Sequence, residues 1–128
     1  MRSRIVVMVL AALTVVGLVA APAAQAKEGD VITRGSCSGS SDWKLKLSPE
    51  DGRIEAEFEV DQNRSGDRWR VRIVHDGDLA FRGTRTTGGA SGSFEVRIVE
   101  PNASGTDTFV GRARNTSTGE VCRGTASF

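Results

Sequence analysis

The chain has 128 residues with a formal net charge of +1, and 38% of its residues are apolar. Met1–Ala26 holds two of the 17 basic residues and none of the 16 acidic ones. The remainder, Lys27–Phe128, therefore carries a net charge of −1 over 102 residues, a size that suits a single domain. A nearly neutral domain argues against nucleic acid or an anionic membrane as its partner.

The first 26 residues are organised like a secretory signal peptide. Arg2 and Arg4 precede an uncharged apolar run, which ends in the small-x-small tripeptide Ala24–Ala26, the form that signal peptidase requires. We expect cleavage before Lys27, which would leave a secreted, extracellular domain over residues 27–128. An uncleaved anchor is the alternative, because the run is nominally long enough to cross a bilayer, about 20 residues. Pro22 makes its last part a poor membrane helix.

Two cysteines, Cys37 and Cys122, predict one disulfide bond. An even pair in an oxidising compartment is normally bonded, and neither cysteine has a second ligand at the spacing of a zinc site. The bond would close a loop over most of the domain and contribute on the order of 4–5 kcal/mol through chain entropy. We interpret it as structural, and we expect it to hold the first strand beside the last.

Apolar and polar residues alternate along the rest of the chain in the way that half-buried strands require. The alternation is clear over residues 43–48, 54–61, 68–73 and 94–98, and turn sequences rich in glycine, asparagine and aspartate separate these segments. No helical periodicity competes with it. Short strands broken by regular turns predict an all-β sandwich or a small barrel.

Charges on the polar positions predict how the strands pair. A turn over Pro49–Gly52 would set Lys46 opposite Glu55, and a hairpin between the next two segments would set Glu59 opposite Arg70. The outer face of these three strands would then alternate in sign, and each pair would contribute a few tenths to about 1 kcal/mol. We therefore interpret the glutamate and arginine runs as a solvated cross-strand ladder rather than as cation, glycosidase or anion sites.

From Phe94 onward, the residue order resembles the E-to-F corner of an immunoglobulin-like domain. A turn leads into Asp107-x-Phe109-x-Gly111-x-Ala113, which is similar to the pattern D-x-Y-x-C-x-A of that family. Residues 54–60 and the following tryptophan likewise resemble strands B and C. The resemblance implies an immunoglobulin-like antiparallel β-sandwich of about 7–8 strands. Gly111 stands at the family's cysteine position, so the two cysteines do not form the B–F disulfide of antibody domains.

More broadly, the chain resembles a group of small secreted actinobacterial proteins with immunoglobulin-like sandwiches and no assigned activity. The shared features are a Gly-x-Cys-Ser-Gly…Asp-Trp-Lys-Leu start over Gly35–Leu45 and a Thr-Gly-Glu-x-Cys end over Thr118–Cys122. The excess of arginine over lysine after residue 26, 12 to 3, fits a GC-rich genome. The resemblance implies a source and a fold, and it implies no mechanism.

His75 is the only histidine, and it directly precedes Asp76-Gly77-Asp78. A catalytic triad needs a nucleophile and an acid that converge on the imidazole, and no nucleophile-elbow motif frames any serine. Calcium usually takes six or more oxygens, so an ion at the two aspartates is left as an open alternative. We predict no catalytic residue, no metal and no cofactor, and we name His75, Asp76 and Asp78 as candidate binding residues.

These observations favour a secreted, non-catalytic β-sandwich that serves as a binding or structural module. Its partner would be an extracellular protein or a component of the cell envelope, bound at loop tips such as Asn63–Asp67 and His75–Asp78. One alternative is a secreted inhibitor of an extracellular hydrolase, with Thr84–Ser93 as its contact loop, although three glycines predict that this loop is flexible. A weaker alternative is a sandwich that sequesters a small molecule in an apolar cleft.

Overall fold

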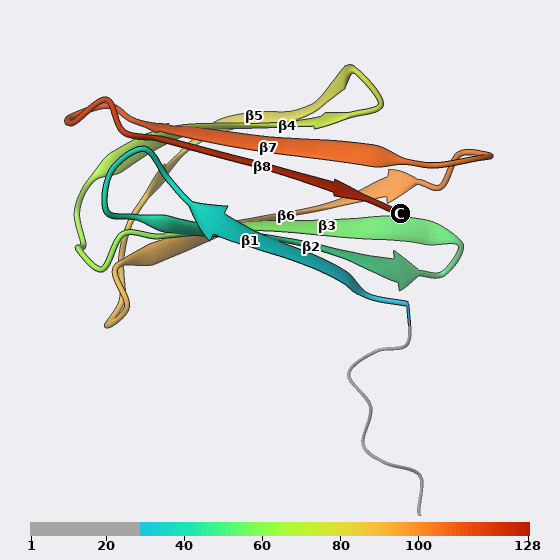
Figure 1. Cartoon of the computed structure of the whole chain (residues 1–128), viewed down its shortest axis with the longest axis horizontal. Coiled ribbons are helices and arrows are strands. Elements are labelled where there is room, and N and C mark those ends of the chain that lie inside the picture. The colour runs from blue at the N-terminus through green and yellow to red at the C-terminus, as the bar shows by residue number, and fades with distance from the viewer. Residues whose placement is uncertain (1–28) are drawn as a thin grey trace, which may run out of the picture.

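The computed structural model describes residues 29–128, and the expected signal peptide lies outside this range. The described chain forms eight antiparallel strands in two stacked sheets (Figure 1). One sheet has the order β1-β2-β3-β6 and the other the order β5-β4-β7-β8. No helix of the described chain has the length and apolarity needed to span a membrane. The strands are β1 (Val31–Ser36), β2 (Asp42–Glu50), β3 (Arg53–Asp61), β4 (Arg68–His75), β5 (Asp78–Thr86), β6 (Ser93–Pro101), β7 (Thr108–Asn115) and β8 (Val121–Ser127).

The strand order confirms the predicted immunoglobulin-like sandwich. Strands β3 and β6 are neighbours in one sheet, while β4 pairs with β7 and β7 with β8 in the other, as strands B, E, C, F and G do in that fold. A Cβ atom added to Gly111 on β7 would lie 2.7 Å from the ring of Phe58 on β3. The Phe58 ring therefore fills the space between the sheets where Gly111 replaces the family's cysteine.

The core lies between the two sheets and consists of the alternating apolar residues. Fifteen apolar residues of the described chain are buried, and Trp69, Phe58 and Phe109 are the largest of them. These residues come from β2, β3, β4, β6, β7 and β8. The period-two pattern in the sequence predicted the buried residues of β2, β3, β4 and β6 correctly. The close packing of these side chains disfavours the hypothesis of a small molecule held between the sheets.

The hairpin between β2 and β3 has a different register from the predicted one. Both strands continue to a two-residue turn, Asp51-Gly52, whose φ angles are 48° and 74°, as in a type I′ turn. Lys46 therefore faces Glu57 instead of Glu55. Opposite charges still meet, because a shift by two residues keeps every side chain on the same face of the sheet.

The predicted hairpin between β3 and β4 is wrong. Strand β3 pairs with β6, and β4 pairs with β5 and β7, so the loop over residues 62–67 carries the chain from one sheet to the other. Glu59 consequently faces Glu95, and Arg70 faces Arg114. The crossing lets Trp69 and its apolar neighbours on β4 pack onto the inner face of the first sheet, which a continued hairpin would not allow.

The predicted disulfide bond between Cys37 and Cys122 is present, and it joins the loop after β1 to β8 across the two sheets. The Ser38 N–H group donates a hydrogen bond to the Val121 carbonyl (2.8 Å). The disulfide bond and this hydrogen bond together hold the end of β1 beside β8, as expected.

The two sequence motifs that carry the actinobacterial resemblance meet around this bond. A Cβ atom at Gly35, or at Gly124 two residues beyond the second motif, would lie less than 3.0 Å from the ring of Trp43. The Ser41 hydroxyl donates a 2.6 Å hydrogen bond to Glu120. The motif residues thus pack against one another, which gives them a structural reason. We call this contact between the two motifs the terminal clasp.

Candidate functional site

The candidate binding residues His75, Asp76 and Asp78 lie at the hairpin that joins β4 to β5. His75 ends β4, Asp78 begins β5, and Asp76-Gly77 forms a two-residue turn with φ angles of 48° and 86°, again as in a type I′ turn. All three residues border one shallow hollow of about 370 Å³, which also contacts the end of β6.

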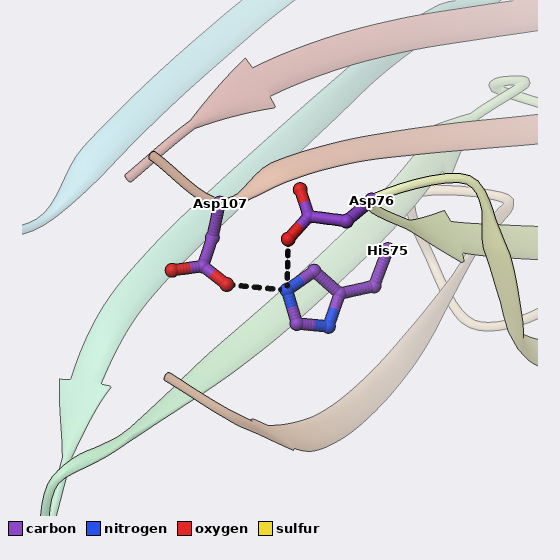
Figure 2. A group of neighbouring side chains, drawn as sticks. All are labelled: His75, Asp76 and Asp107. Atoms are coloured by element: carbon purple, nitrogen blue, oxygen red, sulfur yellow. Dashed lines mark hydrogen bonds and ion pairs between the residues drawn. The ribbon is translucent and has the colours of Figure 1, made fainter. Parts of the chain in front are cut away.

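Asp107, from the loop before β7, joins this hairpin (Figure 2). The His75 Nε2 atom lies 2.6 Å from Asp107 Oδ1 and 3.5 Å from Asp76 Oδ2. The imidazole stacks on Phe109 with a centroid distance of 4.3 Å, and Asp107 is fully buried. Asp78 does not belong to this group. Asp107 was missed as a candidate, although it opens the aspartate-x-aromatic pattern on which the family resemblance rested.

Backbone hydrogen bonds hold the same segments together. The Asp76 N–H group donates to the Thr108 carbonyl (2.8 Å), and the Thr108 N–H group donates to Asp76 Oδ1 (2.7 Å). Asp107 exchanges two backbone hydrogen bonds with Phe128, of 3.0 and 2.8 Å. The cluster therefore fastens the β4–β5 turn and residue 128 to the start of β7.

The geometry of this cluster suits a structural contact better than a reaction centre. Its three side chains could offer a metal ion one nitrogen and two carboxylate oxygens, but the His75 Nε2 atom is already hydrogen-bonded to Asp107. A triad would need a hydroxyl on the imidazole. Within residues 29–128 the polar partners of the imidazole are the Asp76 and Asp107 carboxylates.

The other expected binding tip, Asn63–Asp67, lies at the opposite end of the sandwich (Figure 1). The two tips flank the eight-residue strand β4, so roughly 25 Å separates them. They cannot form one site for a small ligand.

Asp67 organises that second end. Its carboxylate accepts hydrogen bonds from the side-chain amides of Asn115 (2.9 Å) and Gln62 (2.6 Å). These bonds, the one from Asn115 foremost, hold the pKa of Asp67 below its usual value. Gln62 in turn accepts a hydrogen bond from the Trp69 indole (3.1 Å). The network fixes the loop that crosses between the sheets.

A polar cleft of about 690 Å³ lies beside this network, between the β1–β2 loop, residues 62–64 and residues 118–120. Arg64 and Glu120 are the charged residues of its lining, and none of its lining residues is aromatic. Glu120 is hydrogen-bonded to Ser41 within the terminal clasp. The cleft therefore offers few side chains that are free to recognise a ligand.

The loop expected to be flexible, Thr84–Ser93, is held in place. Its first three residues are the last three of β5, and residues 87–92 form the connection to β6. The Gly66 N–H group donates to the Thr87 carbonyl (2.8 Å), and the Gln62 N–H group donates to the Gly92 carbonyl (3.0 Å). These contacts with the 62–67 loop oppose the mobility that the glycines suggested.

The outer surface of the β5-β4-β7-β8 sheet carries a concentration of positive charge that sequence reasoning missed. Arg72 faces Arg82 on one side and Arg112 on the other, and Arg112 faces Arg123. These four residues form the arginine row, which crosses all four strands. With three further outward arginines on β4 and β7 they make up the arginine face. Its residues are Arg68, Arg70, Arg72, Arg82, Arg112, Arg114 and Arg123.

Within residues 29–128, no guanidinium of the arginine face forms an ion pair or a hydrogen bond. All of these arginines are exposed except Arg112, which is half-buried. A hollow of about 460 Å³ lies among Arg70, Arg72, Arg82 and Arg112. The other outward positions carry no charge. They are Val74, Leu79, Thr84, Thr86, Thr108, Val110, Val121, Thr125 and Ser127.

The arginines of this face alternate with buried residues in three separate segments, so each segment alone reads as an ordinary half-buried strand. The sequence predicts Arg70 and Arg72 opposite glutamates of β3 and favours a solvated ladder over an anion site for this run, whereas in the structure both face arginines of β7. Only the sheet order shows that β7 and β8 bring further arginines beside them.

Comparison with known proteins found no matching family model, no matching curated protein and no matching solved structure. The resemblance to small secreted actinobacterial proteins therefore stays a prediction.

Proposed function

We propose that the chain is a secreted, non-catalytic β-sandwich that binds an acidic partner outside the cell through the arginine face. The observation that carries the proposal is the arginine row, in which Arg82, Arg72, Arg112 and Arg123 stand in direct register. Like charges at directly opposed positions destabilise a sheet, so packing gives no reason for the row. An acidic partner, either an extracellular protein or a component of the cell envelope, would supply the missing counter-charge.

Two matched double variants test this proposal. Arg72→Gln with Arg112→Gln removes two charges from the arginine row, whereas Arg34→Gln with Arg53→Gln removes two charges from the outer face of the other sheet. Wild type and both variants are incubated with cell envelopes and with medium proteins of the source organism. We expect the affinity of the row variant to fall by about tenfold or more. The control variant should bind like wild type. Equal binding by all three proteins, or none by wild type, would contradict the proposal.

The hydrogen bond between His75 and Asp107 supports the non-catalytic part of the proposal. Within residues 29–128 the polar partners of the imidazole are two carboxylates, and no hydroxyl or thiol that could serve as a nucleophile is hydrogen-bonded to it. In a broad screen of hydrolase substrates, we expect wild type and His75→Ala to show the same background rate. Turnover by wild type that His75→Ala abolishes would identify an enzyme instead.

The disulfide bond between Cys37 and Cys122 supports secretion, because such bonds persist in oxidising compartments. Intact mass measurement of the protein recovered from culture medium should give a chain that begins at Lys27. A chain that retains Met1–Ala26, or one found only in the cytosol, would argue against secretion.

A secreted hydrolase inhibitor is the second candidate, and the held conformation of residues 87–92 favours it. The Ser65 hydroxyl donates to the Gly89 carbonyl (3.0 Å), which adds to the backbone contacts and provides the preorganisation an inhibitor loop needs. Against it, the exposed residues Gly89, Ala90 and Ser91 offer little to a specificity pocket. Unchanged activity of a panel of extracellular proteases at micromolar protein would remove this candidate.

A further inference from the structure

We infer that the ligand of the arginine face is a linear polyphosphate, that is, phosphate groups joined in a chain without bases. This inference rests on the proposed function and narrows its acidic partner to one chemical class. It follows from the spacing of the arginine row, from the chemistry of its side chains and from the uncharged residues around it.

The spacing of the row favours a ligand with closely spaced anions. Neighbouring strands lie about 4.8 Å apart, so the row of four guanidinium groups extends over about 14 Å. Side chains on one face of an extended peptide recur only every 6.6 Å or so, which is less dense than the row. A polyphosphate carries a negative charge at every phosphorus and can meet successive arginines across β5, β4, β7 and β8.

The side chains of the face suit phosphate oxygens. A guanidinium presents a planar fork of N–H donors that binds phosphate in a bidentate manner, which the ammonium of lysine cannot do. The face contains seven arginines and no lysine. Arg70, Arg72, Arg82 and Arg112 surround the hollow of about 460 Å³ together with Thr84. A phosphate seated there would contact guanidinium groups from three strands.

The uncharged outward residues disfavour two other polyanionic surfaces. Single-stranded nucleic acids stack their bases on aromatic side chains, and no outward position of this sheet holds one. A duplex would need a helix or ribbon that enters a groove, which the broad sheet face lacks. Leu79, at the edge of the face, is 52% exposed, and it is the one large apolar side chain there that could insert into a lipid surface.

Isothermal titration calorimetry with defined probes tests the inference. Residues 27–128 are titrated with long-chain inorganic polyphosphate, inorganic phosphate, heparin, oligo(dT) and anionic phosphatidylglycerol vesicles. We expect polyphosphate to bind most tightly and phosphate alone to bind weakly. Arg72→Gln with Arg112→Gln should weaken polyphosphate binding about tenfold or more. It should also reduce the slope of log K against log salt concentration by roughly 1–2. Arg34→Gln with Arg53→Gln should change neither value.

The outcomes separate this inference from the proposed function. Tighter binding of heparin, oligo(dT) or vesicles, with the same dependence on Arg72 and Arg112, would overturn polyphosphate as the ligand and leave the acidic partner in place. Polyphosphate binding that both double variants weaken equally would overturn the role of the arginine row. Absence of binding to every probe would overturn the inference, and unchanged envelope binding by the row variant would overturn the proposed function as well. Thermal denaturation of each variant verifies that it is folded.

Discussion

The outer face of the β1-β2-β3-β6 sheet mixes basic and acidic residues, although Glu59 faces Glu95 and Arg34 faces Lys44 there. The outer face of the β5-β4-β7-β8 sheet places arginines beside arginines. On the first face, Lys44 lies 3.6 Å from Glu59, and Arg97 forms an ion pair with the buried Glu55. The arginine face has no such pairs within the described chain. Much of the charge on the first face is therefore paired inside the molecule. Charge on the second is what the proposed acidic partner would neutralise.

This difference shows why overall charge was a poor guide to partners. Eight of the 15 acidic residues of the described chain lie on strands β2, β3 and β6, while seven of its 12 arginines lie on the opposite outer surface. A ligand meets a local surface and not an average, because screening limits a charge to about 8–10 Å at physiological salt. Near-neutrality therefore does not exclude polyanions.

Removal of the disulfide bond between Cys37 and Cys122 should have the largest effect on stability. Cys37→Ala with Cys122→Ala should lower the free energy of unfolding by about 4–5 kcal/mol, because the unfolded chain regains the freedom that the closed loop removed. Urea denaturation followed by tryptophan fluorescence measures the loss. Polyphosphate affinity of the fraction that remains folded should stay at the wild-type value. A lower affinity of that fraction would show that the arginine face depends on the other sheet.

Single arginine substitutions should change stability in opposite directions on the two faces. Arg112→Gln relieves repulsion from Arg72 and Arg123 and should raise the free energy of unfolding by up to about 1 kcal/mol. Arg97→Gln leaves the carboxylate of Glu55, with a 5% exposed side chain, without its guanidinium partner, so it should lower stability. Both variants lose one positive charge, and thermal denaturation compares them directly. Effects of the same sign would contradict the contrast between the faces.

The smallest expected effect is a pH dependence of stability that arises from Glu57, on the outer face of the β1-β2-β3-β6 sheet. Burial raises the pKa of Glu57, and a hydrogen bond with Glu55 and the nearby charge of Glu95 raise it further. A raised pKa in the folded state means that Glu57 favours folding below its ordinary value of 4.5 and that this contribution is lost as the pH rises through the folded value. Glu57→Gln should therefore gain stability relative to wild type between about pH 4.5 and pH 7. Denaturation curves recorded across this pH range measure the difference in free energy of unfolding between Glu57→Gln and wild type.

Asp67 provides the opposite sign as an internal comparison. Its pKa is lowered by hydrogen bonds from Asn115 and Gln62, so its contribution is present above its ordinary value and is lost as the pH falls through the folded value. Asp67→Asn should therefore be less stable than wild type at pH 7, and the two proteins should converge in acid. A constant difference at all pH values would show that the carboxylate charge is not what stabilises the loop.

Sequence patterns predicted the features that depend on neighbouring residues. Alternation identified β2, β3, β4 and β6 but not β1, β5 or β8. The cysteine pair indicated the disulfide bond, and the E-to-F pattern indicated the fold. The predicted pairing of β3 with β4 was wrong because the glutamates of β3 are complemented by the arginines of β4 as well as by Arg97 of β6, its true neighbour. Charge alone cannot choose between these partners. The choice depends on which sheet buries Trp69.

The candidate sites show the same limit. His75 and Asp76 could be associated because they are adjacent in sequence, whereas Asp107 reaches them from 32 residues away. The arginine face combines residues from β4, β5, β7 and β8, so it exists only once the sheet order is known. Alternating arginines are equally compatible with an ordinary solvated strand, and no local pattern distinguishes the two.

The terminal clasp also bears on the order of folding. Cys37 and Cys122 are 85 residues apart, and Trp43 is covered by Gly124 from the last strand. Contacts between such distant residues form late, because loop closure must be paid before they can stabilise the fold. Oxidation of Cys37 therefore reports that β8 has docked. The rate at which the two free thiols disappear during refolding measures completion of the sandwich.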